Sequence, residues 1–314
     1  MKQAPFTVRR IDRLCDDVKQ FEFVPADRQR PPWPYPPGAH IVVETPAGAN
    51  PYSLTGDGVR PSAYRISVRR IGDHGGSAWL HDNLEVGSCL EISAPMSSFA
   101  PVASARHHLL VAAGIGVTPI LAHARAARRW GRSFEVIYGH GAGRAPHRDE
   151  LASLAGAGFT EAIGRLALRE ALADALGHQP VGTHAYACGP GAVLDTFTEL
   201  ATRSGWPAER IHVEHFAAPD TGPGEPFTLV VPDLRLRLDI PSGVSVLQAL
   251  DGADIRLPRL CEQGVCGQCR LTVVAGRPEH RDLILSENDR SANDCFYPCV
   301  SRSLTAELEV SLPC

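Results

Sequence analysis

The first hundred residues carry short runs in which apolar and polar positions alternate, the period-two pattern of half-buried β-strands. Glycine- and proline-rich segments separate the runs, among them 31–38, 45–51, 55–61 and 72–76. Many short strands at close spacing predict a small antiparallel β-barrel, to which we assign residues 1–103. The runs are TVRRIDRL, VKQFEFV, AHIVVET, YRISVRR and SCLEISA.

From about residue 104 the pattern changes, and buried apolar runs alternate with longer stretches of helical period. Alternation of strands with helices predicts a parallel sheet with right-handed crossovers, so residues 104–218 are interpreted as an α/β domain. The predicted strands are HHLLVAAG, FEVIYG, GTHAYACG and IHVEHF, and the predicted helices are VTPILAHARAARRW, RDELASLA and GAVLDTFTELATRSG.

A Pro/Gly-rich segment at 219–226 has no apolar periodicity and is predicted to be a linker. Beyond it, residues 227–314 are interpreted as a compact α+β unit of the β-grasp type, so the chain is expected to be multidomain. The predicted elements of this unit are a hairpin from PFTLVVP and LRLRLDI, a helix SVLQALDGA, a strand LTVVAG and a closing segment LTAELEVSL.

The composition is that of an ordinary globular protein, with 44% hydrophobic and 21% charged residues in a chain of 314. The net charge of −4, from 31 basic and 35 acidic residues, argues against generic nucleic-acid binding. The longest apolar stretch, 109–122, is too short and too interrupted to span a bilayer, and no signal-type apolar core begins the chain. Nine cysteines argue against an extracellular disulfide framework, because the number is odd and three are crowded together. We therefore expect a cytoplasmic protein that binds neither membrane nor nucleic acid.

Three of the cysteines, Cys261, Cys266 and Cys269, lie within nine residues, and Cys295 and Cys299 follow. Zinc sites usually pair their cysteines, so a structural zinc with Cys295 and Cys299 as the second pair is one alternative. A disulfide is another, but it requires an oxidising compartment. The C-x4-C-x2-C…C spacing is the plant-type arrangement for a 2Fe–2S cluster, which we favour.

Glycines inside the cysteine loop support this interpretation. Gly264 and Gly267 allow the backbone to turn its amides inward, where N–H groups hydrogen-bond the anionic sulfur atoms and tune their potential. Three ligands on one loop leave one thiolate to come from a distant segment. The spacing alone leaves both Cys295 and Cys299 open for that position.

Two segments of the barrel region are candidates for ligand contacts. Tyr52 and Ser53 lie where a strand is expected to end, although a strand tyrosine with a polar neighbour is an equally simple interpretation. Gly75, Gly76 and Ser77 open a helical stretch, and a helix N-terminus with free N–H groups suits a phosphate. The alternative is a Gly-Gly turn with a serine N-cap.

The α/β region has glycine turns after two of its buried strands. GIGVTP at 114–119 departs from the GxGxxG fingerprint, but its glycines allow close backbone approach to a pyrophosphate at the next helix N-terminus. CGP at 188–190 lies at the carboxyl end of a strand, where open α/β sheets bind ligands. A tight structural turn and a buried structural thiol are the alternatives. The candidate residues are Gly114, Gly116, Thr118, Pro119, Cys188, Gly189 and Pro190.

The segments CEQGVCGQCR, GRPEHRDLILSENDR and CVSRS resemble the ferredoxin domain of the phthalate dioxygenase reductase family, to which vanillate O-demethylase reductases are similar. The resemblance covers essentially the whole chain, in the order flavin barrel, nicotinamide domain and ferredoxin domain. It implies FMN, NADH and a 2Fe–2S cluster as cofactors. In that family the fourth ligand precedes a VSR-like segment, which implies Cys299 as the ligand and Cys295 as a packed thiol.

The resemblance also implies roles in a flavin site. Tyr52 would pack on the isoalloxazine, Ser53 would hydrogen-bond near N5 as the catalytic candidate, and the segment 75–77 would hold the FMN phosphate. The implied flavin-binding residues are Tyr52, Ser53, Ser67, Val68, Gly75, Gly76 and Ser77.

One position departs from the family pattern. Asn50 stands where the RxYS motif has an arginine, which removes a charge-assisted bond to phosphate. Arg65, Arg69 and Arg70 are the candidates to compensate, and FMN is expected in preference to FAD on the resemblance.

In the nicotinamide domain the resemblance implies that Cys188 is a pocket residue and not a nucleophile. It places Phe216 near the flavin face, with a core phenylalanine as the alternative. His140 and Arg144 are candidates for the adenosine ribose. A single arginine is weak evidence for a 2′-phosphate, so NADH is expected and not NADPH.

The implied function is that of the reductase component of a multicomponent oxygenase. NADH gives a hydride to FMN, and single electrons pass to the cluster and on to a terminal oxygenase, for which a Rieske-type partner is favoured. A cytochrome P450 or other haem monooxygenase is the alternative partner. A flavin-poor ferredoxin-like carrier or redox-sensing module is the alternative class. The family precedent implies a monomer.

Overall fold

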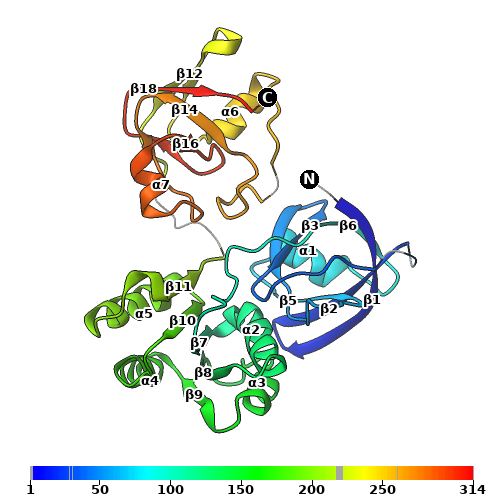
Figure 1. Cartoon of the computed structure of the whole chain (residues 1–314). Coiled ribbons are helices and arrows are strands. Elements are labelled where there is room, and N and C mark those ends of the chain that lie inside the picture. The colour runs from blue at the N-terminus through cyan, green and yellow to red at the C-terminus, as the bar shows by residue number, and fades with distance from the viewer. Residues whose placement is uncertain (1–2, 28, 30, 217–221, 260, 314) are drawn as a thin grey trace. The chain divides into compact units, whose positions relative to one another are not determined.

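The computed structural model describes residues 3–27, 29, 31–216, 222–259 and 261–313. The chain forms two compact units, residues 1–214 and 215–314 (Figure 1). Part of the predicted linker, 219–221, lies outside the described residues. The predicted boundaries at 103/104 and 218/219 stay predictions.

Six antiparallel strands build the first sheet of unit 1, in the order β4-β3-β6-β1-β2-β5. An isolated bridge between Leu54 and Ile66 joins the two edges, so the sheet closes on itself around a core that includes Phe21 and Tyr64. The predicted antiparallel barrel is therefore confirmed. Its elements are β1 (Gln3–Cys15), β2 (Val18–Pro25), β3 (His40–Thr45), β4 (Gly48–Ser53), β5 (Tyr64–Arg69), β6 (Cys89–Ser93) and the helix α1 (Gly76–Asn83).

Strand β4 corrects one interpretation of the sequence, which treated 45–51 as a turn. Only the residues between Thr45 and Gly48 form the turn. Strands β3 and β4 pair from Thr45, which lies opposite Gly48, to His40, which lies opposite Ser53. The proline and glycine of β4 are typical of turns, so the sequence pattern predicted a turn. A strand at the edge of a sheet tolerates these residues, whereas a central strand excludes them.

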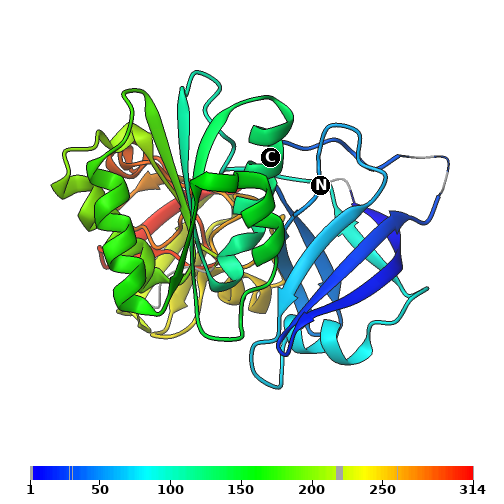
Figure 2. The same cartoon turned by 90° about the horizontal axis from the view of Figure 1, so that it is seen from below.

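Five parallel strands build the second sheet of unit 1, in the order β11-β10-β7-β8-β9. Helices α2 and α3 pack on one face and α4 and α5 on the other (Figures 1 and 2). The predicted parallel sheet is confirmed, with β9 and α4 in addition to the predicted elements. The strands are β7 (His107–Ala113), β8 (Ser133–His140), β9 (Phe159–Ile163), β10 (Thr183–Cys188) and β11 (Ile211–Glu214), and the helices are α2 (Val117–Arg129), α3 (Arg148–Ala155), α4 (Arg165–Gly177) and α5 (Gly191–Arg203).

Strand β7 lies at the centre of the sheet. The chain adds β8 and β9 on one side of β7 and then β10 and β11 on the other side, so the strand order reverses between β7 and β10. Ligands of open α/β sheets bind at such a switch point, outside the carboxyl ends of the strands. The two predicted glycine turns follow these two strands.

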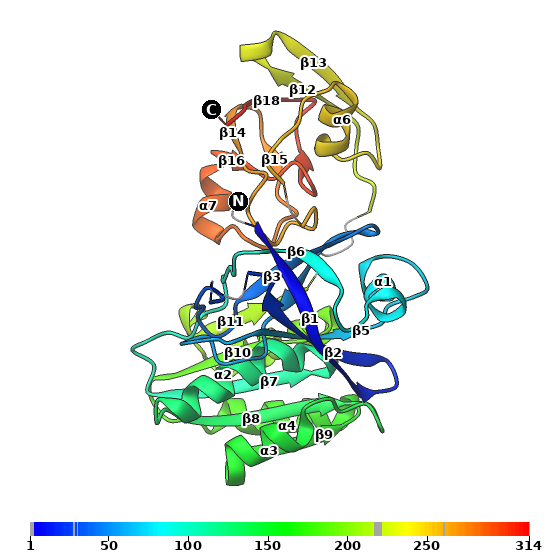
Figure 3. The same ribbon diagram turned by 90° about the vertical axis from the view of Figure 1, so that its right-hand side faces the viewer.

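Unit 2 contains a mixed sheet in the order β13-β12-β18-β14-β16, in which β12 and β18 are parallel. Helix α6 packs against it through Val246, Leu247 and Leu250, and its first turn is closed by a capping box of Ser245 and Gln248 (Figure 3). This α+β arrangement confirms the predicted fold. The elements are β12 (Phe227–Val231), β13 (Leu236–Ile240), α6 (Val246–Gly252), β14 (Leu271–Ala275), β15 (Pro278–Glu279), α7 (Glu287–Ala292), β16 (Cys295–Phe296), β17 (Arg302–Ser303) and β18 (Glu307–Ser311).

Candidate functional sites

Closure of the barrel assembles the predicted flavin residues. The bridge between Leu54 and Ile66 sets Ser53, at the end of β4, beside Ser67 in β5. Ser53, Ser67 and Val68 are buried, and Tyr52 packs against the barrel core. The end of β4 and the strand β5, which are separated by more than ten residues in the sequence, thus form one wall of the predicted flavin site.

The helix α1 begins beside this wall. Its N-cap, Gly75, has a positive φ of 88°, no side chain caps the first turn, and the first turn holds no acidic residue. A Cβ atom on Gly76 would collide with Oδ1 of Asn50 and would lie 3.4 Å from the hydroxyl of Tyr52. Free N–H groups, a positive helix end and close backbone approach suit a phosphate. The Ser77 hydroxyl accepts a 3.1 Å hydrogen bond from the amide of Ile71.

The arginines considered as substitutes for the motif arginine differ in availability. Arg65 and Arg70 form ion pairs with Glu22 and Asp82, each with an N–O distance of 2.5 Å. Within the described part of the chain, Arg69 has no carboxylate partner. Arg69 is therefore the cation of the three that remains available to an anionic ligand.

Arg69 also reaches the glycine turn of the α/β region. Its Nη1 atom lies 3.9 Å from the position of a Cβ atom on Gly114, whose φ is 56°. The Thr118 hydroxyl donates a 3.1 Å hydrogen bond to the carbonyl of Ile115, and Pro119 is buried in the first turn of α2. These two residues hold the shape of the turn, in which Gly114 is half-buried and Gly116 is buried.

The two glycine turns pack on each other, backbone against backbone. A Cβ atom on Gly116 would overlap the carbonyl oxygen of Cys188, and one on Gly189 would lie 2.7 Å from Cβ of Ala113. Pro190 is the N-cap of α5, so both turns lead into helix N-termini. The structure brings the predicted nucleotide-binding residues together at the switch point of the sheet.

Cys188 lies beside a residue that the sequence interpretation missed. Cys188 and Glu214 are paired across the parallel strands β10 and β11. Among the residues that the structure describes, the Oε2 atom of Glu214 has no hydrogen-bond partner. Burial raises the pKa of Glu214 to about 8. Burial, with the Glu214 carboxylate as a second cause, raises the pKa of the Cys188 thiol, so it is not an activated nucleophile. A carboxylate at the carboxyl end of a parallel strand, next to the strand that carries Cys188, was the sequence signal for Glu214.

A second missed residue, His147, connects the two sheets of unit 1. Its Nε2 atom lies 2.8 Å from the hydroxyl of Ser67, and its backbone has a φ of 62°. Burial lowers the pKa of His147 to about 4, so the imidazole is neutral at neutral pH. The side chain of Ser67 is therefore engaged by a protein group.

Two further candidates lie elsewhere. Phe216 belongs to unit 2, and 36% of its surface is exposed, so its predicted place near the flavin stays a prediction. His140 directs Nε2 to Glu161 at 2.9 Å, and Arg148 pairs with the same carboxylate at 2.7 Å. His140 is thus engaged by protein groups.

The cysteine loop of unit 2 forms two thiol pairs. The Sγ atoms of Cys269 and Cys299 lie 3.3 Å apart. Cys261 and Cys266 form the other pair, and a hydrogen bond from the Cys266 thiol lowers the pKa of Cys261. The backbone amide of Gln263 also donates a 3.3 Å hydrogen bond to the sulfur of Cys261. A 2Fe–2S cluster has two irons with two thiolates each, which this arrangement matches.

The glycines of this loop adopt the conformations that the cluster interpretation requires. Gly264 has a φ of 69° and Gly267 a φ of 74°, and a Cβ atom on Gly264 would lie 2.6 Å from Cγ2 of Val300. The amide of Gly264 donates toward the sulfur of Cys299. Inward amides of this kind stabilise anionic sulfur.

Cys295 stands apart from these pairs. It is buried in β16 and pairs with Thr272 of β14. Burial raises its pKa, and none of the four other cysteines contributes to that shift. Within the described ranges, no three His, Cys, Asp or Glu side chains converge on a single metal position. The two thiol pairs suit the two irons of a 2Fe–2S cluster.

Two family models match the chain. Residues 93–211 match the family described as dimethylamine monooxygenase subunit DmmA-like, N-terminal domain. Residues 231–303 match the 2Fe-2S iron-sulfur cluster binding domain. None of the helices in the described part of the chain combines the length and apolar character that crossing a bilayer requires.

Relatives extend over nearly the whole chain. It is 39% identical over 278 residues to the heme-dependent oxidative N-demethylase beta subunit of Ectopseudomonas mendocina (strain ymp), covering 88% of each chain. It is 31% identical to the phthalate dioxygenase reductase of Burkholderia cepacia, covering 96% of this chain and 95% of that one. The solved structure of a phthalate dioxygenase reductase, described as modular for electron transfer from pyridine nucleotides to [2Fe-2S], superposes with a TM-score of 0.76 at 29% identity, covering 99% and 98% of the two chains.

A closed antiparallel sheet, a parallel sheet with a nucleotide-type switch point and a 2Fe–2S domain define an iron–sulfur oxidoreductase that draws on pyridine nucleotide and flavin. The chain belongs to the family of oxygenase reductases that includes phthalate dioxygenase reductase. The family, the class of activity and the cofactor set predicted from the sequence are thereby confirmed.

Proposed function

We propose that this reductase receives electrons from NADH in residues 104–218, passes them through FMN held by residues 1–103, and delivers them from a cluster in residues 227–314 to a terminal oxygenase. The observation that carries the proposal is the shared surface of the first two sites. Arg69 of the barrel reaches the Gly114 turn, and His147 of the α/β region reaches Ser67 of the barrel. Flavin and nicotinamide sites in contact are what hydride transfer requires.

The barrel residues bind and orient the flavin. The N-terminus of α1, with Gly75 and Gly76, holds the phosphate, and Asn50 offers an amide where the family has a cation. Tyr52 and the Ser53–Ser67 wall exclude water from the ring. Bound FMN supplies the conversion between hydride and single-electron transfer.

The α/β residues position the nucleotide. The turns at Gly116 and Gly189 pack on each other, backbone against backbone, and so bring the two nucleotide-binding segments together at the switch point. Glu214 is neutral below its raised pKa and so offers a hydroxyl donor beside Cys188. Such a donor suits the carboxamide of a nicotinamide.

The four cysteines that hold the cluster in this proposal are Cys261, Cys266, Cys269 and Cys299. Their division into two pairs supports it, as do the inward amides of Gln263 and Gly264. We further propose that the chain is a cytoplasmic monomer.

A Rieske-type terminal oxygenase is the partner that the family resemblance favours. A haem oxygenase is a second candidate, because the relative of 39% identity is a subunit of a heme-dependent oxidative N-demethylase. In both cases the acceptor takes one electron at a time from the cluster, so the reductase chemistry is the same.

Anaerobic titration of the purified protein with NADH tests the electron path. We expect flavin and cluster absorption to bleach together, and reoxidation on adding the oxygenase. Cluster absorption with no response to NADH, even after FMN is added, would instead support the carrier alternative. Mixing the reduced protein with a Rieske and with a haem oxygenase separates the two partners, because only the true partner is reduced within the turnover time.

A further inference from the structure

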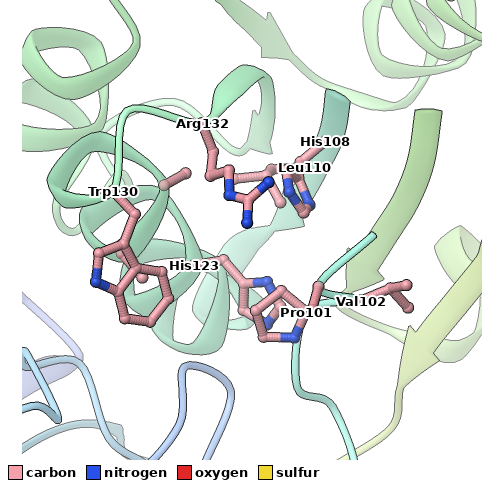
Figure 4. Close-up of a pocket in the computed structure, with 10 residues that line it drawn as sticks. Pro101, Val102, His108, Leu110, His123, Trp130 and Arg132 are labelled. Atoms are coloured by element: carbon pink, nitrogen blue, oxygen red, sulfur yellow. The ribbon is translucent and has the colours of Figure 1, made fainter. Parts of the chain in front are cut away.

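A cavity of 130 Å³ lies in unit 1 at the amino end of the parallel sheet, where α2 ends. The connecting segment 101–103 forms one wall, and the start of β7 and the residue before β8 form others (Figure 4). The glycine turn at Gly116 is at the opposite end of α2, so the cavity is separate from the nucleotide site. The lining residues are Pro101, Val102, Ala103, His108, Leu110, His123, Ala126, Ala127, Trp130 and Arg132.

Specific hydrogen bonds hold the walls in place. Nε2 of His123 lies 2.8 Å from the carbonyl oxygen of Phe99, and the amide of Val102 donates to the hydroxyl of Tyr186 at 2.8 Å. The rings of His123 and His108 pack on Tyr186 with centroid distances of 5.0 and 5.6 Å. These contacts position His108, His123 and the segment that contains Val102 around Tyr186.

His123 leaves one polar atom without a partner. The residue is 3% exposed, and its Nδ1 atom is buried and makes no hydrogen bond within the described ranges of the chain. Because Nε2 faces a carbonyl oxygen, Nε2 carries the proton and Nδ1 is an acceptor. Burial lowers the pKa of His123 to about 4, so this tautomer persists at neutral pH. A buried acceptor of this kind requires a donor from outside the protein.

Arg132 supplies a positive charge to the same cavity. Its guanidinium reaches into the space between His108 and His123 (Figure 4). In the ranges that the structure describes, Arg132 has no ion-pair partner, and no acidic residue lines the cavity. Apart from the two histidines, the remaining walls are mainly apolar, with Leu110 and Trp130 among them.

We propose that this cavity binds a small hydroxycarboxylate, with the carboxylate on Arg132 and the hydroxyl donating to Nδ1 of His123. A guanidinium matches a carboxylate through paired N–H donors. An ammonium donor is disfavoured, because Arg132 repels it and no acidic side chain offsets its charge. A volume of 130 Å³ equals roughly four water molecules, which is the size of a three- or four-carbon acid.

Calorimetric titration of the holoprotein with L-lactate tests the site. We expect saturable binding with a Kd of roughly 1 mM, as suits a ligand of about six heavy atoms. Propionate lacks the hydroxyl donor and should bind about fivefold more weakly, since one hydrogen bond is lost. 1,2-Propanediol lacks the carboxylate and should not bind. Equal affinity for lactate and propionate, or no saturable binding of lactate, would overturn the proposal.

Variants locate the binding. Arg132→Gln should abolish lactate binding, while Arg128→Gln should leave it unchanged, because Arg128 is an exposed arginine in the last turn of α2 that does not line the cavity. Ala126→Leu should fill the cavity and also abolish binding. NADH-dependent cytochrome c reduction by all three variants, at the unmodified rate, shows that they are folded. Lactate binding that survives both Arg132→Gln and Ala126→Leu would place it elsewhere and refute the assignment.

Discussion

The Sγ atoms of Cys269 and Cys299 lie 3.3 Å apart although the residues are 30 positions apart in the chain. Together with the pair of Cys261 and Cys266, they give the two thiol pairs that a 2Fe–2S cluster requires. Cys295 lies in β16 with Thr272 as its partner and contributes to neither pair. Cys299 also lies directly before the VSR segment of the sequence, which is the position of the fourth ligand in the family that the chain resembles.

Substitution of Cys299 by serine is expected to remove most of the cluster, because one iron loses its thiolate. Iron and sulfide content, and the reduction of cytochrome c, should fall at least tenfold. Reduction of FMN by NADH should persist. Cys295→Ser is the matched control and should keep its cluster; loss of the cluster in that variant with retention in Cys299→Ser would reverse the assignment.

Gly116→Ala is expected to impair use of NADH. The new methyl group would overlap the Cys188 carbonyl, so the two turns must separate, at a cost of about 1–3 kcal/mol. We expect kcat/KM for NADH to fall roughly tenfold or more and the thermal midpoint to fall. Gly141→Ala is the control, because a Cβ atom there meets no neighbour within 4 Å among the residues that the structure describes. If both variants behave alike, the close approach of the turns has no functional role.

Asn50→Arg is expected to strengthen FMN binding by restoring a cation beside the N-terminus of α1. A charge-assisted hydrogen bond contributes about 1.5–3 kcal/mol, which corresponds to roughly tenfold or more in Kd. Fluorescence titration of the apoprotein with FMN measures the change. Asn83→Arg adds the same charge at the other end of α1 and should have little effect. Equal tightening in both variants would point to general electrostatics instead of a phosphate contact.

Glu214 is expected to make stability depend on pH. Its folded pKa, about 8, exceeds the ordinary value of 4.5, so between these values the folded state holds a proton that the unfolded state has lost. The contribution of Glu214 is fully present below about pH 4.5 and decreases as the pH rises toward 8, with a slope of at most about 1.4 kcal/mol per pH unit.

Glu214→Gln removes this titration while keeping the shape of the side chain. The variant should therefore gain thermal stability relative to the parent as the pH rises from 5.5 to 8. Thermal midpoints of both proteins at several pH values, with cofactors bound, measure the difference. A constant difference across that range would show that Glu214 is ionised in the folded protein.

Much of the fold was predictable because its signals are local. Alternating apolar positions predicted the strands of the barrel, and buried runs followed by helical periods predicted the parallel sheet. The β4 segment escaped because its pairing with β3, and not its own composition, makes it a strand. The short edge strand β9 has three exposed residues, so its sequence shows only a weak hydrophobic pattern, and its pairing with β8 makes it a strand.

The sequence by itself determined the family, the order of the three sites and the cysteine spacing, because each depends on residues close together in the chain. The tertiary structure alone decided which distant groups meet. It set Glu214 beside Cys188, His147 on Ser67, and Arg132 and His123 around one cavity. These relationships follow from strand register and helix packing, which bring together side chains that no local pattern relates, and burial then fixes their charge and their hydrogen-bonding needs.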